Sequence, residues 1–522
     1  MKKIVFLLIS MCICASCSDD FITLNPPSQL NADGFYKTEA DMNQAVLSAY
    51  GRLRDLYNAQ YVRLGEIRSD NTTYSWLAGN PANEKGIDEF ASPLLPENSF
   101  LNDTWNNSYN LILRANIVID RIDALSFNDE SLKAQYKAEA KFLRALMYFY
   151  LNRIFGGHAQ NGELLGVVKV DKEITQAEAY ELGRASLQEI YDLIIEDLTF
   201  AEANLPEAYG PTDVGRATKG GAAGLLGKVY MTMAGYPLNG GTEYYTKAIA
   251  QFRKIINNAQ YALVPTYDAL FDVSNKNTSE SLFEVQYKKG SPNGATGSPW
   301  NNTFAPRFSD KEVVLVGDKG GENAPTRDMS EAYETGDPRK YVSMRDGWTN
   351  AKTGAWESDK YVCKYYDVST SGSDNGNNWI ELRLADIYLL HAEALVRTNG
   401  DKQEAIDYVN KIRQRARNTE GDPEVEAPDD LLKDLSAADF STNEALLSAI
   451  EKERRIELAF ENHRWFDLVR TGRAKEVMIA EQVYDGYAAF NWSDTELAYP
   501  IPITVMQSNP QKIIQNNGYT QL

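Results

Sequence analysis

The chain has 522 residues and a formal net charge of −20 at pH 7. This acidity excludes a general nucleic-acid-binding protein, because an acidic surface repels phosphate groups instead of neutralising them. The length is enough for one large domain or several average ones, and a chain of this size can be stabilised by its hydrophobic core alone.

Residues 1–16 predict a signal peptide. Lys2 and Lys3 precede the apolar run 4–9, and the small pair Ala15-Ser16 stands directly before Cys17. A charged start, a short apolar run and small residues before the cut are typical of secretory signals, and the run is too short to cross a bilayer as a helix. A cysteine at this place predicts a lipoprotein whose Cys17 thiol is acylated after cleavage. The alternative is a plain cleaved signal peptide.

Residues 17–30 predict a lipidated tether that holds the body of the protein off the membrane. The segment is polar and contains Pro26-Pro27. Cys12 and Cys14 leave with the signal and acylation uses Cys17, so Cys363 remains and no internal disulfide is expected. No later segment has 18 uninterrupted apolar residues, so no transmembrane helix is expected.

Apolar residues recur at helical spacing over much of the remaining chain. The predicted helices are 38–57, 105–125, 131–155, 186–203, 218–234, 243–258, 383–397 and 402–417. Short turns join helices within 186–258 and within 383–417, and small residues at contact positions let neighbouring helices approach closely. Such units resemble tetratricopeptide repeats. The expected fold class is therefore all-α, with tetratricopeptide-like helix pairs forming a scaffold, long irregular loops and a few short strands.

The segments 60–104 and 265–380 predict loops, because Gly, Asn, Ser and Pro accumulate there and helical periodicity fades. Within the second region, 281–287 and 361–367 alternate as short strands do. More than a hundred residues of loop and short strand are too many for a simple connection, and long ordered loops usually carry function. A further insert, 419–439, is acidic and is expected to be exposed to solvent.

Aromatic residues in these loops are the candidate ligand contacts. Indole in a Gly- and Asn-rich loop is less easily explained as core than indole on a helix. A sugar ring stacks its C–H face on an indole, while Asn, Asp and Arg side chains bond its hydroxyl groups. The candidate site residues are Asp70, Asn71, Tyr74, Trp76, Trp300, Asn301, Asn302, Arg307, Trp348, Trp356 and Trp379. The alternative is that some of these indoles close small loop cores.

Catalytic motifs are absent or incomplete. Gly221–Lys228 looks like a phosphate loop, but Ala222 occupies the first glycine position and Val229 follows Lys228 where Ser or Thr is required, so helix packing explains the glycines. Glu453, Glu457 and Glu461 fall four apart, as on one helical face, but neighbouring arginines favour a structural salt network over glycosidic acid–base work. We therefore expect no catalytic residues.

Metal-binding patterns are weak. His158, His391 and His463 lie in no HExxH motif and near no cysteine, and His391 and His463 are expected to be structural. The oxygen-rich stretch 371–378 resembles a Ca²⁺ loop faintly, but Leu382 stands where a bidentate Glu should be. We expect no metal site and no cofactor, with a structural Ca²⁺ left open as the alternative.

Six segments together carry a family resemblance. The C-terminal third contains LRLADIYLLHAEAL (382–395), IEKERRIELAFENHRWFDLVRTGR (450–473) and AYPIPITVMQSNPQKIIQNNGY (498–519). The N-terminal half contains WNNSYNLILRANIVIDRI (105–122), AEAKFLRALMYFYLNRIFGG (138–157) and RATKGGAAGLLGKVYM (216–231). In this order they resemble the RagB/SusD family of nutrient-binding outer-membrane lipoproteins. One departure is His158-Ala159, where the family often has Val-Pro, and it affects only a loop.

The resemblance implies an organisation and a function. It divides the mature chain into a SusD-like half, 31–235, and a RagB/SusD-like half, 236–522, which includes the ligand-loop region 265–380. Family members bind oligosaccharides, or sometimes peptides, cap a TonB-dependent SusC-like transporter, and are not enzymes. Their ligand residues lie in variable loops and do not transfer by position, whereas Arg464–Arg470 corresponds to the structural core. The acidic tract Ser18-Asp19-Asp20 resembles the signal that exports Bacteroidetes-type lipoproteins to the cell surface.

The expected function is therefore that of a lipid-anchored binding protein on the outer face of the outer membrane. It would capture an oligosaccharide and deliver it to the transporter, with its lipid as the only contact to the membrane. Three alternatives stay open: peptide capture by a protein of the same family, a glycoside hydrolase, and a helical assembly scaffold without a small ligand.

Overall fold

The computed structural model of the chain describes residues 36–521, apart from 59, 75–81, 91–93, 161, 293–295, 312, 315–319, 368–373 and 485–491. The predicted signal peptide, Cys17 and the tether lie outside the described residues, as does Trp76.

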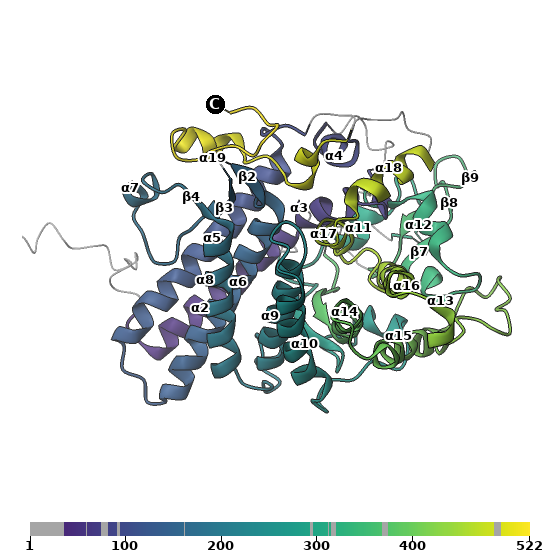
Figure 1. Ribbon diagram of the computed structural model, residues 1–522, viewed down its shortest axis with the longest axis horizontal. Helices are drawn as coiled ribbons and strands as arrows, with labels where there is room; N and C mark the ends of the chain where they lie inside the picture. Colours follow the sequence, from purple (N-terminus) through teal and green to yellow (C-terminus); the bar gives the residue numbers. More distant parts are fainter. Residues whose placement is uncertain are drawn as a thin grey trace, which may run out of the picture.

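Long helices that pack in chain order form the scaffold. They are α2 Glu39–Tyr57, α5 Ser99–Arg121, α6 Glu130–Phe155, α8 Leu187–Asn204, α9 Lys219–Ala234, α10 Thr242–Ile256, α14 Leu384–Arg397, α15 Lys402–Arg417 and α16 Asn443–Glu457. Each helix from α2 to α10 packs against the next, α10 contacts α14, and α14 packs against α15 and α16 (Figure 1). The predicted all-α class is confirmed, and the predicted helices agree with the observed ones to within two residues at each end, except that α5 begins six residues before the predicted start at Trp105 and ends four residues before Leu125.

Side chains at the first turns explain where these helices begin. Asp41 N donates to Thr38 Oγ1 and Thr38 N donates to Asp41 Oδ2, at 3.2 and 2.9 Å, which forms a capping box at the start of α2. Ser186 and Glu189 form the same box at the start of α8. Asp129 caps α6 by accepting hydrogen bonds from the first backbone N–H groups.

Short helical segments connect the scaffold to the loops. They are α3 Gln60–Val62, the π-helix η2 Arg63–Ile67, α4 Ala82–Asp88, η4 Ile122–Ala124, α7 Gln176–Ala179, η5 Asp268–Leu270, α11 Trp300–Phe304, α12 Arg327–Ala332, α13 Pro338–Ser343, η7 Ala437–Asp439, α17 Arg464–Arg470, α18 Ala474–Tyr484, η8 Asp494–Leu497 and α19 Ile503–Ser508.

The strands are short and pair in small antiparallel sheets. The two-stranded pairs are β1 Thr72–Thr73 with β6 Ala324–Pro325, β5 Ser281–Val285 with β11 Trp379–Arg383, β7 Met344–Arg345 with β10 Tyr361–Val362, and β8 Trp348–Thr349 with β9 Trp356–Glu357. A three-stranded sheet contains β2 His158–Gln160, β3 Glu163–Val168 and β4 Arg184–Ser186. The strand predicted over 281–287 is confirmed as β5, whereas of the stretch 361–367 only Tyr361–Val362 forms a strand, β10.

The glycine-rich stretch Gly221–Lys228 lies inside α9 and is not a phosphate loop. A Cβ atom at Gly227 would collide with the Phe252 ring of α10, and one at Gly224 would come within 2.7 Å of Leu382 on β11. Glycine therefore allows α9 to approach its neighbours closely. Helix packing, the interpretation favoured by the sequence, is confirmed.

A buried ion-pair network joins α13, β11, α15 and α16. Arg383 donates to Glu457 at 2.6 Å and to Glu461 at 2.8 Å, and Arg339 donates to Glu453 at 2.5 Å. These five side chains are almost fully buried. The predicted structural salt network is confirmed, but Glu461 lies in the turn beyond α16 and not on its helical face.

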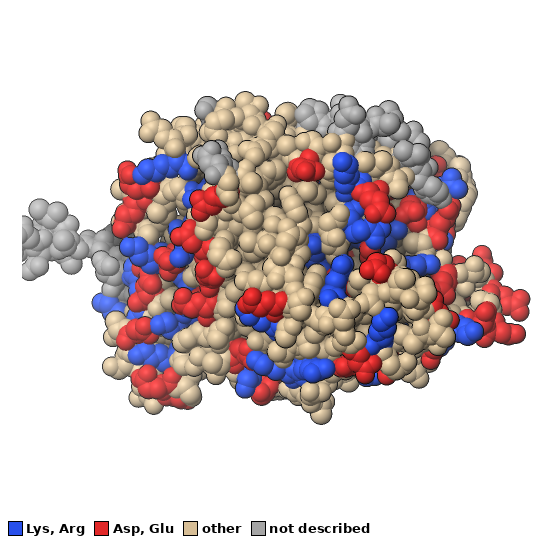
Figure 2. Space-filling view, viewed as in Figure 1, with Lys and Arg blue, Asp and Glu red and all other residues tan. Residues whose placement is uncertain are grey.

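The acidic insert 419–439 is exposed over part of its length. The insert 419–439 contains a run of exposed residues from 423 to 430, which includes Glu424, Glu426, Asp429 and Asp430. Figure 2 shows acidic side chains gathered at the right-hand edge, where this segment projects in Figure 1. The predicted exposure is confirmed. Among the helices that the structure describes, none is long and apolar enough to cross a membrane.

Candidate ligand-binding site

The two predicted loop regions meet in the sheet of β1 and β6. Thr72 pairs with Pro325, and the hydroxyl of Thr326 donates to the carbonyl of Asp70 at 2.8 Å. The segment 70–74, which leads toward Trp76, is therefore fixed against the region 265–380.

Trp300 and Trp379 lie in the hydrophobic core, and both are 0% exposed. Their rings pack on each other with centroids 5.0 Å apart, and the Tyr365 ring stacks on Trp379 at 5.3 Å. The expected exposure of these two indoles is wrong, because α11 and β11 turn them toward the same interior cluster. In this structure they support the loops and present no face to a ligand.

Asn301 and Asn302 are also buried, and their amides join loop segments to one another. Asn301 Nδ2 donates to the carbonyl of Asp367 at 2.8 Å, and Asn375 Nδ2 donates to Asn302 Oδ1 at 3.1 Å. Hydrogen bonds of this kind compensate the cost of burying polar groups. Both asparagines therefore organise the loop region from within.

The hairpin of β8 and β9 separates the two remaining tryptophans. Trp348 pairs with Glu357, and Thr349 pairs with Trp356, so the two indoles point to opposite faces of the hairpin. Trp348 is 4% exposed, whereas Trp356 is 67% exposed. The predicted exposure is confirmed for Trp356 and wrong for Trp348. The Trp356 ring lies against Gly347, where a Cβ atom would collide with it.

Two further exposed aromatic side chains in the region 265–380 were not predicted. Phe308 is 43% exposed and Tyr366 is 46% exposed. The carbonyl of Phe308 accepts a hydrogen bond from Ala351 N in the hairpin turn at 2.7 Å, and its φ of 63° is a costly conformation for a bulky residue. Phe308, Trp356 and Tyr366 share exposure and a place in the region 265–380, and we call these three side chains the aromatic loop face. Among the described residues, the one other strongly exposed aromatic side chain is Tyr180.

Asp70 and Asn71 are buried, and both are 1% exposed. Arg464 donates two hydrogen bonds to the Asp70 carboxylate at 2.7 and 2.8 Å, and Arg455 Nε donates to Asn71 Oδ1 at 2.9 Å. Burial opposes ionisation of Asp70, but the charges of Arg455 and Arg464 outweigh burial and lower its pKa to about 2. The expected ligand contact by these two side chains is not supported, because their polar groups are already engaged inside the protein.

Two further buried acids hold the same segment. Glu66 Oε1 accepts a hydrogen bond from Asn71 Nδ2 at 2.8 Å, and Asp88 Oδ2 accepts one from Thr73 Oγ1 at 2.5 Å. Burial raises the pKa of each carboxyl group to about 7. The loop 70–74 is thus anchored by groups that change charge near neutral pH.

Tyr74 and Arg307 are half-buried. The Tyr74 hydroxyl donates to Glu89 Oε1 at 2.7 Å. Tyr74 belongs to the predicted loop 60–104 and Arg307 to the predicted loop region 265–380, so both remain proposed ligand contacts. Trp76 lies outside the described residues.

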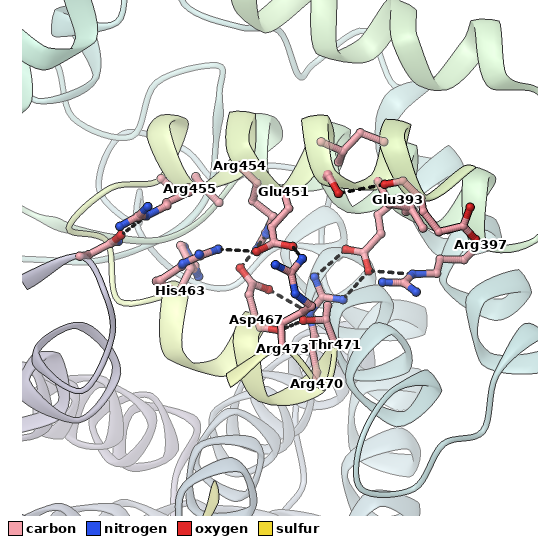
Figure 3. Close-up of a pocket in the computed structure, with 17 residues that line it drawn as sticks. Glu393, Arg397, Glu451, Arg454, Arg455, His463, Asp467, Arg470, Thr471 and Arg473 are labelled. Carbon is pink, nitrogen blue, oxygen red and sulfur yellow. Dashed lines mark hydrogen bonds and ion pairs between the residues drawn. The ribbon is translucent and has the colours of Figure 1, made fainter. Parts of the chain in front are cut away.

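A charged cleft of about 200 Å³ lies between α14, α16 and α17, with Asn71 on its wall (Figure 3). Arg470 donates to Glu393 at 2.9 and 2.6 Å and to Asp467 at 2.9 Å, and Arg473 donates to Glu451 at 2.8 Å. Figure 3 shows these side chains directed at one another across the cleft. Since cations and anions pair along the lining, most of its charge is used to hold the three helices together.

The carboxylates of the network do not suit glycosidic catalysis. A general acid must hold a proton near the working pH. Burial disfavours the ionised forms of Glu457 and Glu461, but neighbouring Arg and Lys charges outweigh it and lower each pKa to about 2. Glu66 and Asp88 do hold a proton near pH 7, but both are buried against backbone and loop groups.

His391, His463 and Cys363 are likewise placed as structural groups. His391 and His463 are buried, and burial lowers the pKa of His463 to about 3. Cys363 is a free thiol whose pKa burial raises to about 11. In the part of the chain that the structure describes, no group of three or more His, Cys, Asp or Glu side chains is arranged to hold a metal ion.

Two family models match the sequence. One, described as the SusD family, matches residues 339–519, and the other, described as starch-binding and associating with the outer membrane, matches residues 20–231. The chain belongs to the SusD/RagB family. The predicted family is confirmed, and the helix pairs described above are the tetratricopeptide-like scaffold of that fold.

Individual relatives agree with this assignment. The SusD-like protein P25 of Formosa agariphila is 27% identical over 99% of this chain and 98% of its own length. A SusD superfamily protein from Parabacteroides distasonis has 26% identity and a TM-score of 0.74 over 91% of this chain and 99% of its own. A laminarin-binding SusD-like protein has 27% identity and a TM-score of 0.71 over 93% of this chain and 100% of its own.

Proposed function

We propose that this SusD-family protein binds an oligosaccharide at the cell surface and passes it to a TonB-dependent SusC-like transporter in the outer membrane. It acts as a binding protein and not as an enzyme. Cys17 carries the lipid that attaches it to the membrane.

The single observation that carries the proposal is the exposed indole of Trp356. Its ring is 67% exposed on an ordered hairpin and has Gly347 behind it. Phe308 and Tyr366 add exposed rings in the same loop region. An aromatic face of this kind packs on the C–H face of a sugar, at about 1 kcal/mol per ring beyond the area it buries.

The comparison with relatives supports a carbohydrate ligand. One neighbour of this fold at 27% identity is described as laminarin-binding, and the N-terminal family model is described as starch-binding. A few stacked rings with hydrogen bonds correspond to micromolar affinity, and such affinity allows release to a transporter.

A glycan array tests the proposal. The full-length protein, purified in detergent, is expected to retain a restricted set of neutral glycans and to leave them uncleaved. Laminarin and starch are included because relatives are described as binding them. Cleavage of a retained glycan would contradict a binding function, and retention of peptides with no glycan would favour peptide capture.

Partnership with the transporter has its own test. Tagged protein recovered from outer membranes of the native organism is expected to bring a TonB-dependent transporter with it. Recovery of the tagged protein alone, under conditions that keep other lipoprotein complexes intact, would contradict the partnership.

A further inference from the structure

A groove of about 240 Å³ has none of the three residues of the aromatic loop face in its lining. It is formed by the loop between α8 and α9 and by the segment between α10 and β5, at the lower ends of these helices in Figure 1. Phenol, hydroxyl and amide groups form part of its lining, and they belong to Tyr209, Thr218, Gln260, Tyr261, Asn277 and Thr278.

Aromatic and apolar groups form part of the wall. The Tyr261 ring packs so closely against the first turn of α9 that a Cβ atom at Gly220 would collide with it. Tyr209 is half-buried, and Val214 is 47% exposed at the rim. These groups offer the kind of apolar surface on which the C–H face of a sugar ring packs.

The charged side chains in the lining, Arg216 and Glu284, already have partners within the protein. Arg216 pairs with Glu139 at 3.2 Å and with Asp213 at 2.8 Å. Glu284 accepts hydrogen bonds from Asn378 Nδ2 at 2.8 Å and from a backbone N–H at 3.0 Å. The groove therefore favours a neutral ligand over an ionic one.

The amide groups of the wall are held in fixed orientations. The side chains of Asn277 and Gln286 exchange two hydrogen bonds, at 3.0 and 2.8 Å. Gln260 Nε2 donates to the carbonyl of Glu207 at 3.0 Å. Fixed amides with hydroxyl groups beside them match the neighbouring hydroxyls of a sugar, which both donate and accept hydrogen bonds.

We infer that this groove is a second saccharide-binding site, which takes one neutral sugar unit. The inference rests on the proposed function for its ligand class. A polysaccharide that reaches both the groove and the aromatic loop face would be held by two weak contacts, and linked contacts of this kind raise overall affinity well above that of either site.

Saturation-transfer NMR on the full-length Trp356→Ala protein tests the groove in a protein whose aromatic loop face has lost its most exposed ring. The probes are glucose, galactose, mannose and xylose, each measured alone. We expect transfer to at least one sugar, and at least a fivefold loss of it on adding Gln260→Ala or Val214→Asp, both at exposed positions. Adding Tyr180→Ala, at an exposed aromatic outside both sites, is the matched control and should change nothing.

The outcomes separate the groove from the proposed function. Transfer that is absent for all four sugars, or that is unchanged in both groove variants, overturns the second site. Transfer that depends on the groove, in a protein that retains no glycan on the array, supports the second site and counts against the proposed function.

Discussion

Arg464 donates two parallel hydrogen bonds to Asp70, and this pair joins a loop near the start of the folded chain to α17 near its end. Both side chains are buried. Removing one partner of a buried ion pair leaves the other charge unpaired, which costs about 3–5 kcal/mol. The pair therefore stabilises the base of the loop 70–74.

Asp70→Asn is expected to lower the free energy of unfolding by about 3 kcal/mol, because it removes the buried carboxylate that Arg464 and Arg455 share and leaves Arg464 paired with Glu451 alone. Urea unfolding of the full-length protein measures the change. Asp55→Asn is the matched control, since Asp55 forms a half-exposed pair with Arg52 at 2.7 Å, and such pairs contribute below about 1 kcal/mol. Equal losses in the two variants would contradict the role assigned to Asp70.

Trp300→Ala is expected to destabilise the protein by about 3–5 kcal/mol, because it empties a fully buried position against Trp379 and Tyr365. Trp356→Ala should change stability by less than about 0.5 kcal/mol, since its ring is mostly exposed. Thermal unfolding of both variants checks the contrast. A stable Trp300→Ala protein would show that this indole does not support the loops.

The stability contributed by Glu66 should fall as the pH rises. Burial raises its pKa from an ordinary value near 4.5 to about 7, so the folded state holds a proton that the unfolded state has already released. This contribution is complete below about pH 4.5 and is lost as the pH rises through about 7. Between pH 5 and 8, the wild type should lose about 2–3 kcal/mol relative to Glu66→Gln, which has no proton to release.

Comparison with the variant is needed because other groups act in the opposite sense. Burial lowers the pKa of His158 to about 4 and that of His463 to about 3, so both disfavour folding as the pH falls below 6.5. Their contributions cancel in the difference between the two proteins. Urea unfolding at several pH values gives that difference, and parallel curves would contradict the raised pKa of Glu66.

Cys17→Ala is expected to abolish lipid attachment and to release the protein from the outer membrane. Radiolabelled palmitate should label the wild type and leave the variant unlabelled. Membrane fractionation then reports where each protein resides. A variant that stays membrane-bound would show that the protein is held there by something other than its lipid.

The helical scaffold was predictable because long amphipathic segments and capping residues act locally. The helix expected through Glu461 shows where local reasoning fails. α16 ends at Glu457, and Phe460 and Asn462 take positive φ values of 66° in the turn that follows. Their backbone N–H groups donate to Glu66, at 2.9 and 2.8 Å. A carboxylate almost 400 residues away in the sequence thus shapes this turn.

Exposed aromatic side chains were expected in the loop region 265–380, and Trp356 is one, but most of the residues named from the sequence are buried. Loop composition indicates irregular backbone, yet it does not reveal which side chains are buried. Trp300 and Trp379 are buried by each other, across 79 positions of sequence. Trp348 and Trp356 differ because they occupy opposite faces of a hairpin with two-residue strands, which are too short to show alternation. Phe308 and Tyr366 carried no recognisable signal in the sequence.

The most direct test of the account is an isothermal titration of the glycan identified on the array into wild type, Trp356→Ala and Tyr180→Ala. The account predicts at least a tenfold weaker affinity for Trp356→Ala and an unchanged affinity for Tyr180→Ala, whose exposed ring lies outside the loop region. Equal affinity in all three proteins would contradict the central claim that the aromatic loop face binds carbohydrate.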